Sequence, residues 1–305
     1  MIGRILVPLD QSAFAEQALL RAMELARRAG AILRLVSVSA PAAPFGSEWL
    51  PAPLAGMGDR VHLDRIRYLE EMSGWARRAS GLPVETAVLT GFVADTIRED
   101  ARASHVDLIV MSTHGRTGST CRWIGSVADA VVRHGERPVF LVHAQRTAQA
   151  EPTRTLPRSV LVPLSGTAAG ECVLEPMLDL VESAARCELL HVVGTDVRED
   201  DPVWRERHAA LEMIADRLSR QRPELQLTVR VARDEFPARA IVGAAGAVDL
   251  VAIATRGHGP SRVVLGSVTD ALLRGTSADV LVMRQDPDAA AHEPEHSAEL
   301  AGAAG

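Results

Sequence analysis

Short apolar runs alternate with amphipathic stretches along most of the chain. In the first half, apolar runs predict strands at residues 4–9, 32–38, 84–89, 107–111 and 139–142. Between these runs, apolar residues recur with a helical period and predict helices at residues 12–29, 60–80, 94–103 and 127–134. Strands that are apolar throughout and separated by helices are typical of a parallel sheet covered by helices on both faces.

The same order of elements is repeated in the second half of the sequence. "ILVPLDQS" (5–12) matches "VLVPLSGT" (160–167), and "VDLIVMSTHG" (106–115) matches "VDLVAIATRG" (248–257). Three further pairs lie in the same order: "LRLVSVS" (33–39) with "LLHVVGT" (189–195), Gly125-Ser126 with Gly266-Ser267, and "RPVFLV" (137–142) with "ADVLVM" (278–283). We therefore predict an α/β fold of two repeated domains, each a five-stranded parallel sheet with helices on both faces.

Polar segments that contain proline set the boundaries of these domains. Residues 144–158 predict a linker between a first repeat at residues 1–143 and a second repeat at residues 159–284. Residues 285–305 are rich in Ala, Glu, His, Asp and Pro without an apolar period, and they predict a disordered tail. We expect the last strand of each repeat to lie at a sheet edge, where a bare apolar strand invites pairing with another strand.

Composition excludes several classes of function. The formal net charge is −6 at pH 7, which argues against a nucleic-acid or anionic-membrane partner. The chain contains no lysine, so it lacks the lysine of a Walker A phosphate loop and of a Schiff base. Its three cysteines, Cys121, Cys172 and Cys187, form no CxxC pair, and no signal peptide or membrane-length apolar run is present. These features predict a cytoplasmic protein.

The stretch from Met111 to Val132 joins a predicted strand to a predicted helix and is rich in Gly and Ser. Free amides at the start of a helix, beyond the carboxyl end of a parallel strand, form a site for anions such as phosphate. A capping box at Ser126-x-x-Asp129, repeated at Ser267-x-x-Asp270, explains the same residues without a ligand. The local pattern leaves both interpretations open.

The complete arrangement resembles the universal stress protein family, whose nucleotide-binding members carry G-x2-G-x9-G-[S/T]. The first repeat reads Ser112-x2-Gly115-x9-Gly125-Ser126, which keeps the spacing but replaces the first glycine with serine. The second repeat reads Ala254-x2-Gly257-x8-Gly266-Ser267, one residue shorter, and it has Ser165 in place of Asp10. The resemblance covers both repeats, and therefore nearly the whole chain except the tail.

This resemblance implies a Rossmann-like fold of the adenine nucleotide alpha hydrolase type, with ATP bound in the first repeat. Asp10 would accept hydrogen bonds from the ribose hydroxyls. The other implied contacts are Pro8, Leu9, Val38 and Met111 around adenine, and Ser112, Gly115, Gly125, Ser126 and Val127 around the phosphates. The alternatives are that Asp10 caps the following helix beside Ser12, and that Pro8, Val38 and Met111 are ordinary core residues.

The second repeat is expected to hold a degenerate site that binds nucleotide weakly or not at all. Its members are Ser165, Gly257, Gly266 and Ser267. In the family the last strands pair across a dimer, so we expect the two repeats to form an intramolecular pseudo-dimer, and a homodimer of the whole chain stays open.

The resemblance favours a nucleotide-responsive stress or regulatory protein. No lysine and no obvious base lie near the expected γ-phosphate, so we expect no enzyme, with slow ATP hydrolysis left open. Any Mg²⁺ would be held by the phosphates, with no metal ligand from the protein. The alternative is a scaffold of the same fold that binds no nucleotide and acts through protein–protein contacts.

Overall fold

The computed structural model of the 305-residue chain describes residues 2–39, 57–113, 124–143, 156–255 and 266–285, and only the backbone of residues 57–59. The first half contains, in order, β1 (Arg4–Pro8), α1 (Ala13–Ala29), β2 (Ile32–Ser39), α3 (Met57–Ser80), β3 (Val84–Thr90), α4 (Val93–Ala103), β4 (Leu108–Ser112), α5 (Ser126–His134) and β5 (Val139–Val142). Each predicted strand and helix of this half is present, with ends within three residues of the prediction.

The second half repeats this order with one difference. It contains β6 (Ser159–Pro163), η2 (Ala168–Val173), α7 (Leu174–Leu178), β7 (Arg186–Val193), α8 (Pro202–Gln221), β8 (Gln226–Arg233), α9 (Pro237–Ala245), β9 (Leu250–Thr255), α10 (Ser267–Gly275) and β10 (Asp279–Arg284). The 17-residue helix α1 is replaced here by two short segments, η2 and α7. Pro176 lies in α7 and lacks an N–H donor, which disfavours one long helix at this position.

Helix α1 shows how local sequence fixes an element. Ser12 is its N-cap, and the Ser12 hydroxyl accepts a hydrogen bond from the Ala15 amide. Gly30 ends the helix in a left-handed conformation, with φ of 68°, which glycine adopts without strain. Between these ends, one face of the helix is buried against the sheet through Ala18, Leu19 and Leu25.

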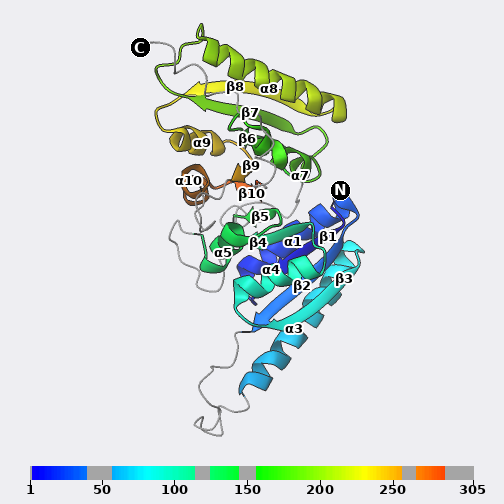
Figure 1. Cartoon of the computed structure of the whole chain (residues 1–305). Coiled ribbons are helices and arrows are strands. Elements are labelled where there is room, and N and C mark those ends of the chain that lie inside the picture. Colours follow the sequence, from blue (N-terminus) through cyan, green and yellow to red (C-terminus); the bar gives the residue numbers. More distant parts are fainter. Residues whose placement is uncertain (1, 40–56, 114–123, 144–155, 256–265, 286–305) are drawn as a thin grey trace, which may run out of the picture.

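All ten strands form one sheet in the order β3-β2-β1-β4-β5-β10-β9-β6-β7-β8. Every pairing within a half is parallel, which confirms the predicted pair of five-stranded parallel sheets. The two halves meet through β5 and β10, which pair antiparallel with Phe140 opposite Leu281. The predicted pseudo-dimer is therefore confirmed, and Figure 1 shows the two halves joined at these strands.

Helices cover both faces of the sheet. In the first half, α1 and α3 pack on one face through residues such as Leu19 and Leu69, while α4 and α5 pack on the other through Ile97 and Val131. The core on each face continues from one half into the other. Among the described helices, none is long and apolar enough to cross a membrane.

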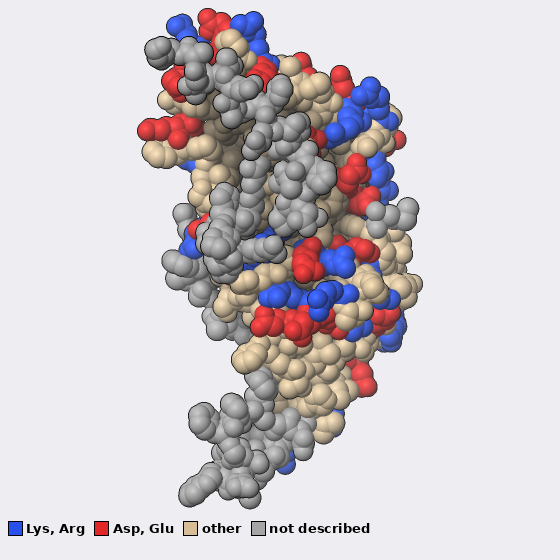
Figure 2. Space-filling view, in the orientation of Figure 1, with Lys and Arg blue, Asp and Glu red and all other residues tan. Residues whose placement is uncertain are grey.

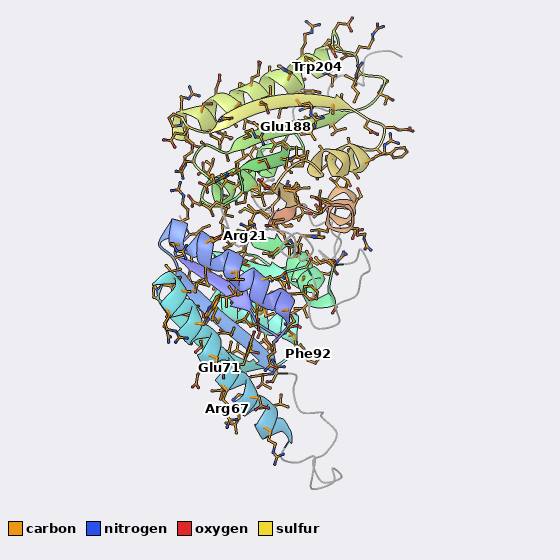
Figure 3. The ribbon with its side chains drawn as sticks, turned by 180° about the vertical axis from the view of Figure 1, so that it is seen from behind. Arg21, Arg67, Glu71, Phe92, Glu188 and Trp204 are labelled. Atoms are coloured by element: carbon orange, nitrogen blue, oxygen red, sulfur yellow. The ribbon has the colours of Figure 1, made fainter. Side chains whose placement is uncertain are left out.

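Buried polar contacts fasten the junction between the halves. Arg21 of α1 lies 3.1 Å from the carboxylate of Asp279, whose side chain is only 3% exposed, and the amide of His143 donates to the same carboxylate at 2.9 Å. On the other side, Arg284 donates from Nη1 to the carbonyl oxygen of Arg133 (2.6 Å). Figure 3 shows Arg21 at the end of the first half that faces the second half.

The aspartates of the two "VDL" motifs lie at the amino ends of the strands. Asp107 accepts hydrogen bonds from the amides of Gly3 and Arg4, at the start of β1. Asp249 accepts hydrogen bonds from the equivalent amides of Arg158 and Ser159, at the start of β6. Both aspartates are therefore structural.

Strand register corrects one of the sequence matches. Pro8 of β1 pairs with Val36, and the equivalent Pro163 of β6 pairs with Leu190. Val36 thus corresponds to Leu190. The match of "LRLVSVS" with "LLHVVGT" had instead aligned Val36 with Val192, two residues later. A shift of two residues keeps every side chain on the same face of a strand, so the hydrophobic pattern did not detect the error.

Basic and acidic side chains are mixed on the surface. Figure 2 shows arginines beside carboxylates across the visible face. The close pairs include Arg133 with Asp129 (2.7 Å), which is partly exposed, and Arg34 with Asp100 (2.6 Å), which is largely buried. The guanidinium pKa of Arg34 is raised, chiefly by its hydrogen bond to Asp100.

Candidate functional site

A pocket of about 290 Å³ opens at the carboxyl ends of β1, β2 and β4, beside the start of α5. It brings together all nine described members of the predicted site: Pro8, Leu9, Asp10, Val38, Met111, Ser112, Gly125, Ser126 and Val127. The tenth member, Gly115, lies outside the described residues. The position agrees with the general rule that ligands of parallel α/β sheets bind beyond the carboxyl ends of the strands.

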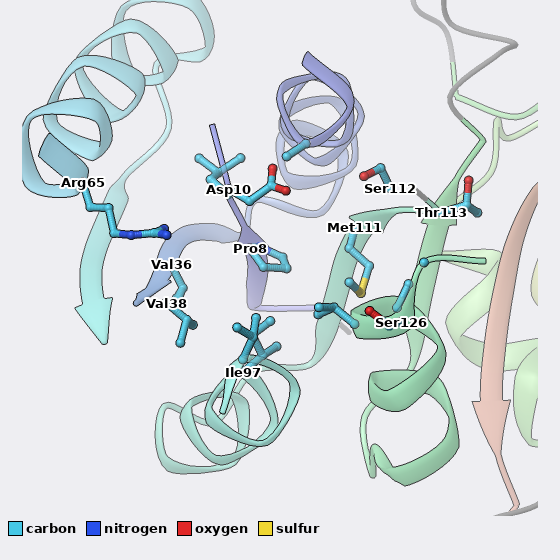
Figure 4. Close-up of a pocket in the computed structure, with 16 residues that line it drawn as sticks. Pro8, Asp10, Val36, Val38, Arg65, Ile97, Met111, Ser112, Thr113 and Ser126 are labelled. Carbon is cyan, nitrogen blue, oxygen red and sulfur yellow. The ribbon is translucent and has the colours of Figure 1, made fainter. Parts of the chain in front are cut away.

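One wall of the pocket is apolar. Val36 and Val38 of β2, Ile97 of α4 and Met111 of β4 line it, as Figure 4 shows. All four side chains are buried and also belong to the core on the α4–α5 face of the sheet. Val38 and Met111 are therefore core residues, as the alternative interpretation expects, and both also line the pocket.

Asp10 lies at the end of β1, where the chain turns into α1. Its Oδ1 accepts hydrogen bonds from the amide (3.1 Å) and the hydroxyl (2.6 Å) of Ser12. Ser12, not Asp10, caps the helix, so the proposed cap at Asp10 is corrected to a supporting contact. Gln11, between them, has a φ of 69°, and Asp10 lines the pocket.

The start of α5 differs from the predicted capping box. Gly125 is the N-cap, with no side-chain cap, and the first helical bond runs from the Asp129 amide to the Gly125 oxygen (2.9 Å). Ser126 is therefore already inside the helix, and the predicted capping box is wrong. The Asp129 carboxylate instead binds Arg133 at 2.7 Å. The same holds in the second half, where Gly266 precedes α10 without a side-chain cap.

The Gly125 amide is also not available to a ligand, because it donates to the carbonyl oxygen of Thr113 at 2.6 Å. The amides of Ser126, Val127 and Ala128 precede the first helical bond, so they have no acceptor within the helix. Gly125 itself has a φ of −61°, so its conformation does not require glycine. The amides that could bind an anion at this helix start therefore begin at Ser126, and not at Gly125 as predicted.

Ser112 fits the site without strain. It is the last residue of β4 and is buried beside the pocket. Among the described non-glycine residues, only Gln11 and His105 have a positive φ, so Ser112 adopts ordinary strand geometry. The replacement of the family's first glycine by serine therefore needs no unusual backbone conformation.

Arg65 is a pocket residue that the sequence did not reveal. It projects from α3 toward the end of β2, and its Nη1 donates to the hydroxyl of Ser37 at 2.7 Å. Figure 4 shows Arg65 and Ser126 on opposite sides of the pocket. No sequence motif marks this arginine, because its role depends on which face of α3 overhangs the strand end.

The second half has a pocket of about 530 Å³ at the equivalent strand ends. Three of the four residues of the predicted degenerate site line it, namely Ser165, Gly266 and Ser267, while Gly257 lies outside the described residues. His191 occupies the position of Ser37, and its Nδ1 donates to the carbonyl oxygen of Leu164 at 2.8 Å. Burial lowers the pKa of His191, and the nearby Arg207 adds to this effect.

No group of three or more His, Cys, Asp or Glu side chains that could hold a metal occurs among the described residues. Asp10 is the one carboxylate among the described residues that line the first pocket. This donor set does not fit a metal held by protein ligands alone. The described thiols, Cys172 and Cys187, are free, and burial raises the pKa of Cys172 to about 11.

Comparison with known proteins agrees with this arrangement. A sequence model of the universal stress protein family matches residues 1–143 and again residues 157–284. A universal stress protein of Mycobacterium tuberculosis (strain ATCC 25618 / H37Rv) is 25% identical over 299 residues, which cover 92% of this chain and 96% of that protein. One from Methanocaldococcus jannaschii is 30% identical over 145 residues, 46% of this chain and 81% of that protein.

Solved structures show the same fold. A universal stress protein from Archaeoglobus fulgidus DSM 4304 aligns with a TM-score of 0.67 at 16% identity, over 93% of this chain and 97% of that one. Because the family model matches both halves and together covers most of the sequence, the family assignment does not depend on the fold alone. The chain belongs to the universal stress protein family.

Proposed function

We propose that the protein binds ATP in the pocket of its first half and acts as a nucleotide-responsive stress or regulatory protein in the cytoplasm. The observation that carries this proposal is the convergence of nine residues from β1, β2, β4 and α5 on one pocket. These residues come from distant parts of the sequence, and together they bring apolar side chains, a carboxylate and the amides at the start of α5 to one pocket.

The pocket offers a separate environment for each part of a nucleotide. Val36, Val38 and Ile97 supply an apolar wall for the base. Asp10 supplies a carboxylate that can accept hydrogen bonds from ribose hydroxyls. At the far side, the amides of Ser126 and Val127, which have no acceptor within α5, suit phosphate oxygens, because a helix N-terminus carries partial positive charge.

The proposal is one of binding and not of efficient turnover. Efficient phosphoryl transfer needs a positioned water or nucleophile and cations that neutralise the developing charge. Among the described pocket residues, Arg65 is the one cation, and it lies across the pocket from Ser126. Mg²⁺, where present, would be held by the phosphates.

Asp10→Asn provides the direct test. The amide oxygen keeps an acceptor for Ser12, while the negative charge that orients the ribose is lost. We expect ATP to raise the melting temperature of the parent protein, since a ligand of the folded state stabilises it, and to raise that of Asp10→Asn much less. Thermal shift with increasing ATP measures both.

The second half supplies the matched control, Ser165→Ala, at the position equivalent to Asp10. This variant should retain the full ATP-dependent shift of the parent. A parent protein that shows no shift with ATP, and releases no nucleotide when purified and denatured, contradicts the proposal.

A scaffold without nucleotide is the second candidate. The hydrogen bond from the Gly125 amide to Thr113 favours it, because this bond removes one donor from the expected phosphate site. In that case the pocket would be filled by the chain itself, and the protein would act through protein–protein contacts, as the chain or as a homodimer. Absence of ATP stabilisation in a protein that is otherwise folded supports this candidate.

A further inference from the structure

We propose that the pocket of the second half binds a small anionic molecule with an apolar body, such as an aryl or alkyl phosphate, and not an adenine nucleotide. This inference goes beyond the proposed function, because it assigns a different class of ligand to the other pocket.

The pocket keeps the frame of the first one but is larger. Leu190, Val192 and Ile253 stand where the first half has Val36, Val38 and Met111, and Ile241 stands where it has Ile97. The volume is about 530 Å³ against about 290 Å³. An apolar wall of this extent suits an aromatic or aliphatic body, since most ligand pockets bind chiefly through such surfaces.

The described lining of this pocket lacks the negative charge that a ribose site needs. Ser165 replaces Asp10, and its hydroxyl lies 3.0 Å from the hydroxyl of Thr167. No Asp or Glu is found among the described residues that line this pocket. The carboxylate that would orient a ribose is therefore missing, and nothing in the described lining repels an anion.

A cation stands close to the same edge. A Cβ placed on Gly166, one residue beyond Ser165, would lie 2.9 Å from Arg207 Nη1 and 3.4 Å from His191 Cε1. The ion pair of Arg207 with Glu206 is long (3.8 Å), and the Glu206 side chain is 69% exposed, so solvent weakens it. Arg207 thus adds positive potential near the pocket.

Hydrogen-bond donors gather at the start of α10. The first helical bond runs from the Asp270 amide to the Gly266 oxygen (3.0 Å), which leaves the amides of Ser267, Val268 and Thr269 without an acceptor in the helix. The Asp270 carboxylate, which would oppose an anion here, is directed to Arg274 at 2.8 and 3.0 Å.

Thr269 is the independent sign of a ligand. It lines the pocket and is only 2% exposed, and its hydroxyl has no hydrogen-bond partner in the part of the chain that the structure describes. The first half has Ala128 at this position, which offers no hydroxyl. An anion bound at the helix start would accept the hydrogen bond of this hydroxyl.

The test is a titration of the ¹⁵N-labelled full chain with phenyl phosphate, followed at single amides. We expect saturable shifts at Ser267, Val268 and Thr269. Ser165→Asp restores the charge of the first pocket, and it should weaken this binding by at least about tenfold, because like charges repel in a partly buried site. Ser165→Asn has the same shape without the charge, and it should bind phenyl phosphate like the parent.

A second variant tests the hydroxyl. Thr269→Val keeps the shape of the side chain and should weaken phenyl phosphate binding about three- to tenfold, the range expected for one lost hydrogen bond. Benzyl alcohol, which lacks the anion, should not shift these amides to saturation.

Several results would overturn the inference. They are the absence of shifts at residues 267–269 up to millimolar phenyl phosphate, equal losses in Ser165→Asp and Ser165→Asn, or saturable shifts of these amides by ADP in the parent. A parallel ADP titration read at Ser126 and Val127 reports on the first pocket alone. Failure of the proposed nucleotide site is thereby separated from failure of this one.

Discussion

At the scale of single residues, the two pockets keep apolar side chains on one wall and differ at a few polar positions. Asp10 becomes Ser165, and Ser37 becomes His191, at equivalent strand ends. Arg65 of α3 and Arg207 of α8 occupy equivalent positions. This follows because the leucine four residues later in each helix, Leu69 or Leu211, is buried against the sheet. The charge of a pocket is therefore set by very few positions.

Arg65 leads to a residue-scale prediction that depends on the proposed function. Because Arg65 lies at the end of β2, across the pocket from Ser126, we expect it to contact the base or ribose of a nucleotide. Arg65→Leu should weaken AMP, ADP and ATP by the same factor, about three- to tenfold, the range of an arginine–ring contact. Isothermal titration calorimetry with the three nucleotides measures this.

The matched control is Arg207→Leu, which alters the equivalent arginine of the second half. It should leave the affinity for all three nucleotides unchanged. If the loss in Arg65→Leu grows with the number of phosphates, Arg65 contacts the phosphates and the expected orientation is wrong.

At the scale of elements, the turns after β1 and β6 and the helices that follow them decide the shape of each pocket. Gly166 has a φ of 80°, and Gln11, its counterpart, has a φ of 69°. Both residues have a left-handed backbone conformation, so the chain turns in the same way after β1 and after β6. Beyond them, α1 is one long helix, whereas η2 and α7 are short.

Two glycine substitutions should therefore have opposite effects. Gly166→Ala forces a side chain into the left-handed region, and we expect it to lower the free energy of unfolding by about 1–2 kcal/mol. Gly243 lies within α9, and no atom lies within 4 Å of a Cβ built there, so Gly243→Ala should raise the free energy of unfolding by up to about 1 kcal/mol. Urea denaturation followed by circular dichroism distinguishes them, and equal effects of the two changes would contradict the prediction.

Much of this element structure could be predicted from the sequence, because strand and helix periods are local properties. The capping box at Ser126 could not be decided in this way. The position of the N-cap depends on where the backbone first becomes helical. The structure places this N-cap at Gly125, one residue before Ser126. The broken helix of the second half was likewise not predicted, and the two-residue error at β7 arose because such a shift conserves the face of each side chain.

The site was predicted to the extent that its residues follow strand ends. Strand ends that are distant in the sequence meet at one end of a parallel sheet, and the family resemblance named Asp10, Val38 and Met111 at these ends, where the structure brings them to one pocket. Arg65, Thr269 and the engaged amide of Gly125 could not, because each depends on how a helix or loop packs against the sheet.

At the scale of the whole molecule, the junction of β5 with β10 turns two domains into one sheet. Phe140 and Leu281, opposite each other at this junction, are fully buried. Polar contacts between the halves, such as Arg21 with Asp279, lie beside this apolar centre. We therefore expect the two halves to depend on each other for stability.

Asp279→Ala tests this dependence. The change removes one of two carboxylates beside Arg21, which keeps Glu24 at 3.3 Å, and it removes the acceptor of the His143 amide, so we expect a loss of about 1.5–3 kcal/mol in the free energy of unfolding. Asp64→Ala is the control, because Asp64 forms a long (4.0 Å) pair with Arg67 in which both side chains are more than two-thirds exposed. That change should cost less than about 0.5 kcal/mol, as for most exposed pairs. Urea denaturation of both variants measures the difference, and equal losses would show that the junction carries no special stability.

The antiparallel contact of β5 and β10 has a consequence for how the two pockets can change over time. In a dimer of identical subunits, one substitution appears at both symmetry-related positions at once. Here both partners of the contact are encoded in a single polypeptide, so a carboxylate can be kept at Asp10 while a hydroxyl replaces it at Ser165. Fusion of the two domains thus permits one molecule to carry two unlike pockets.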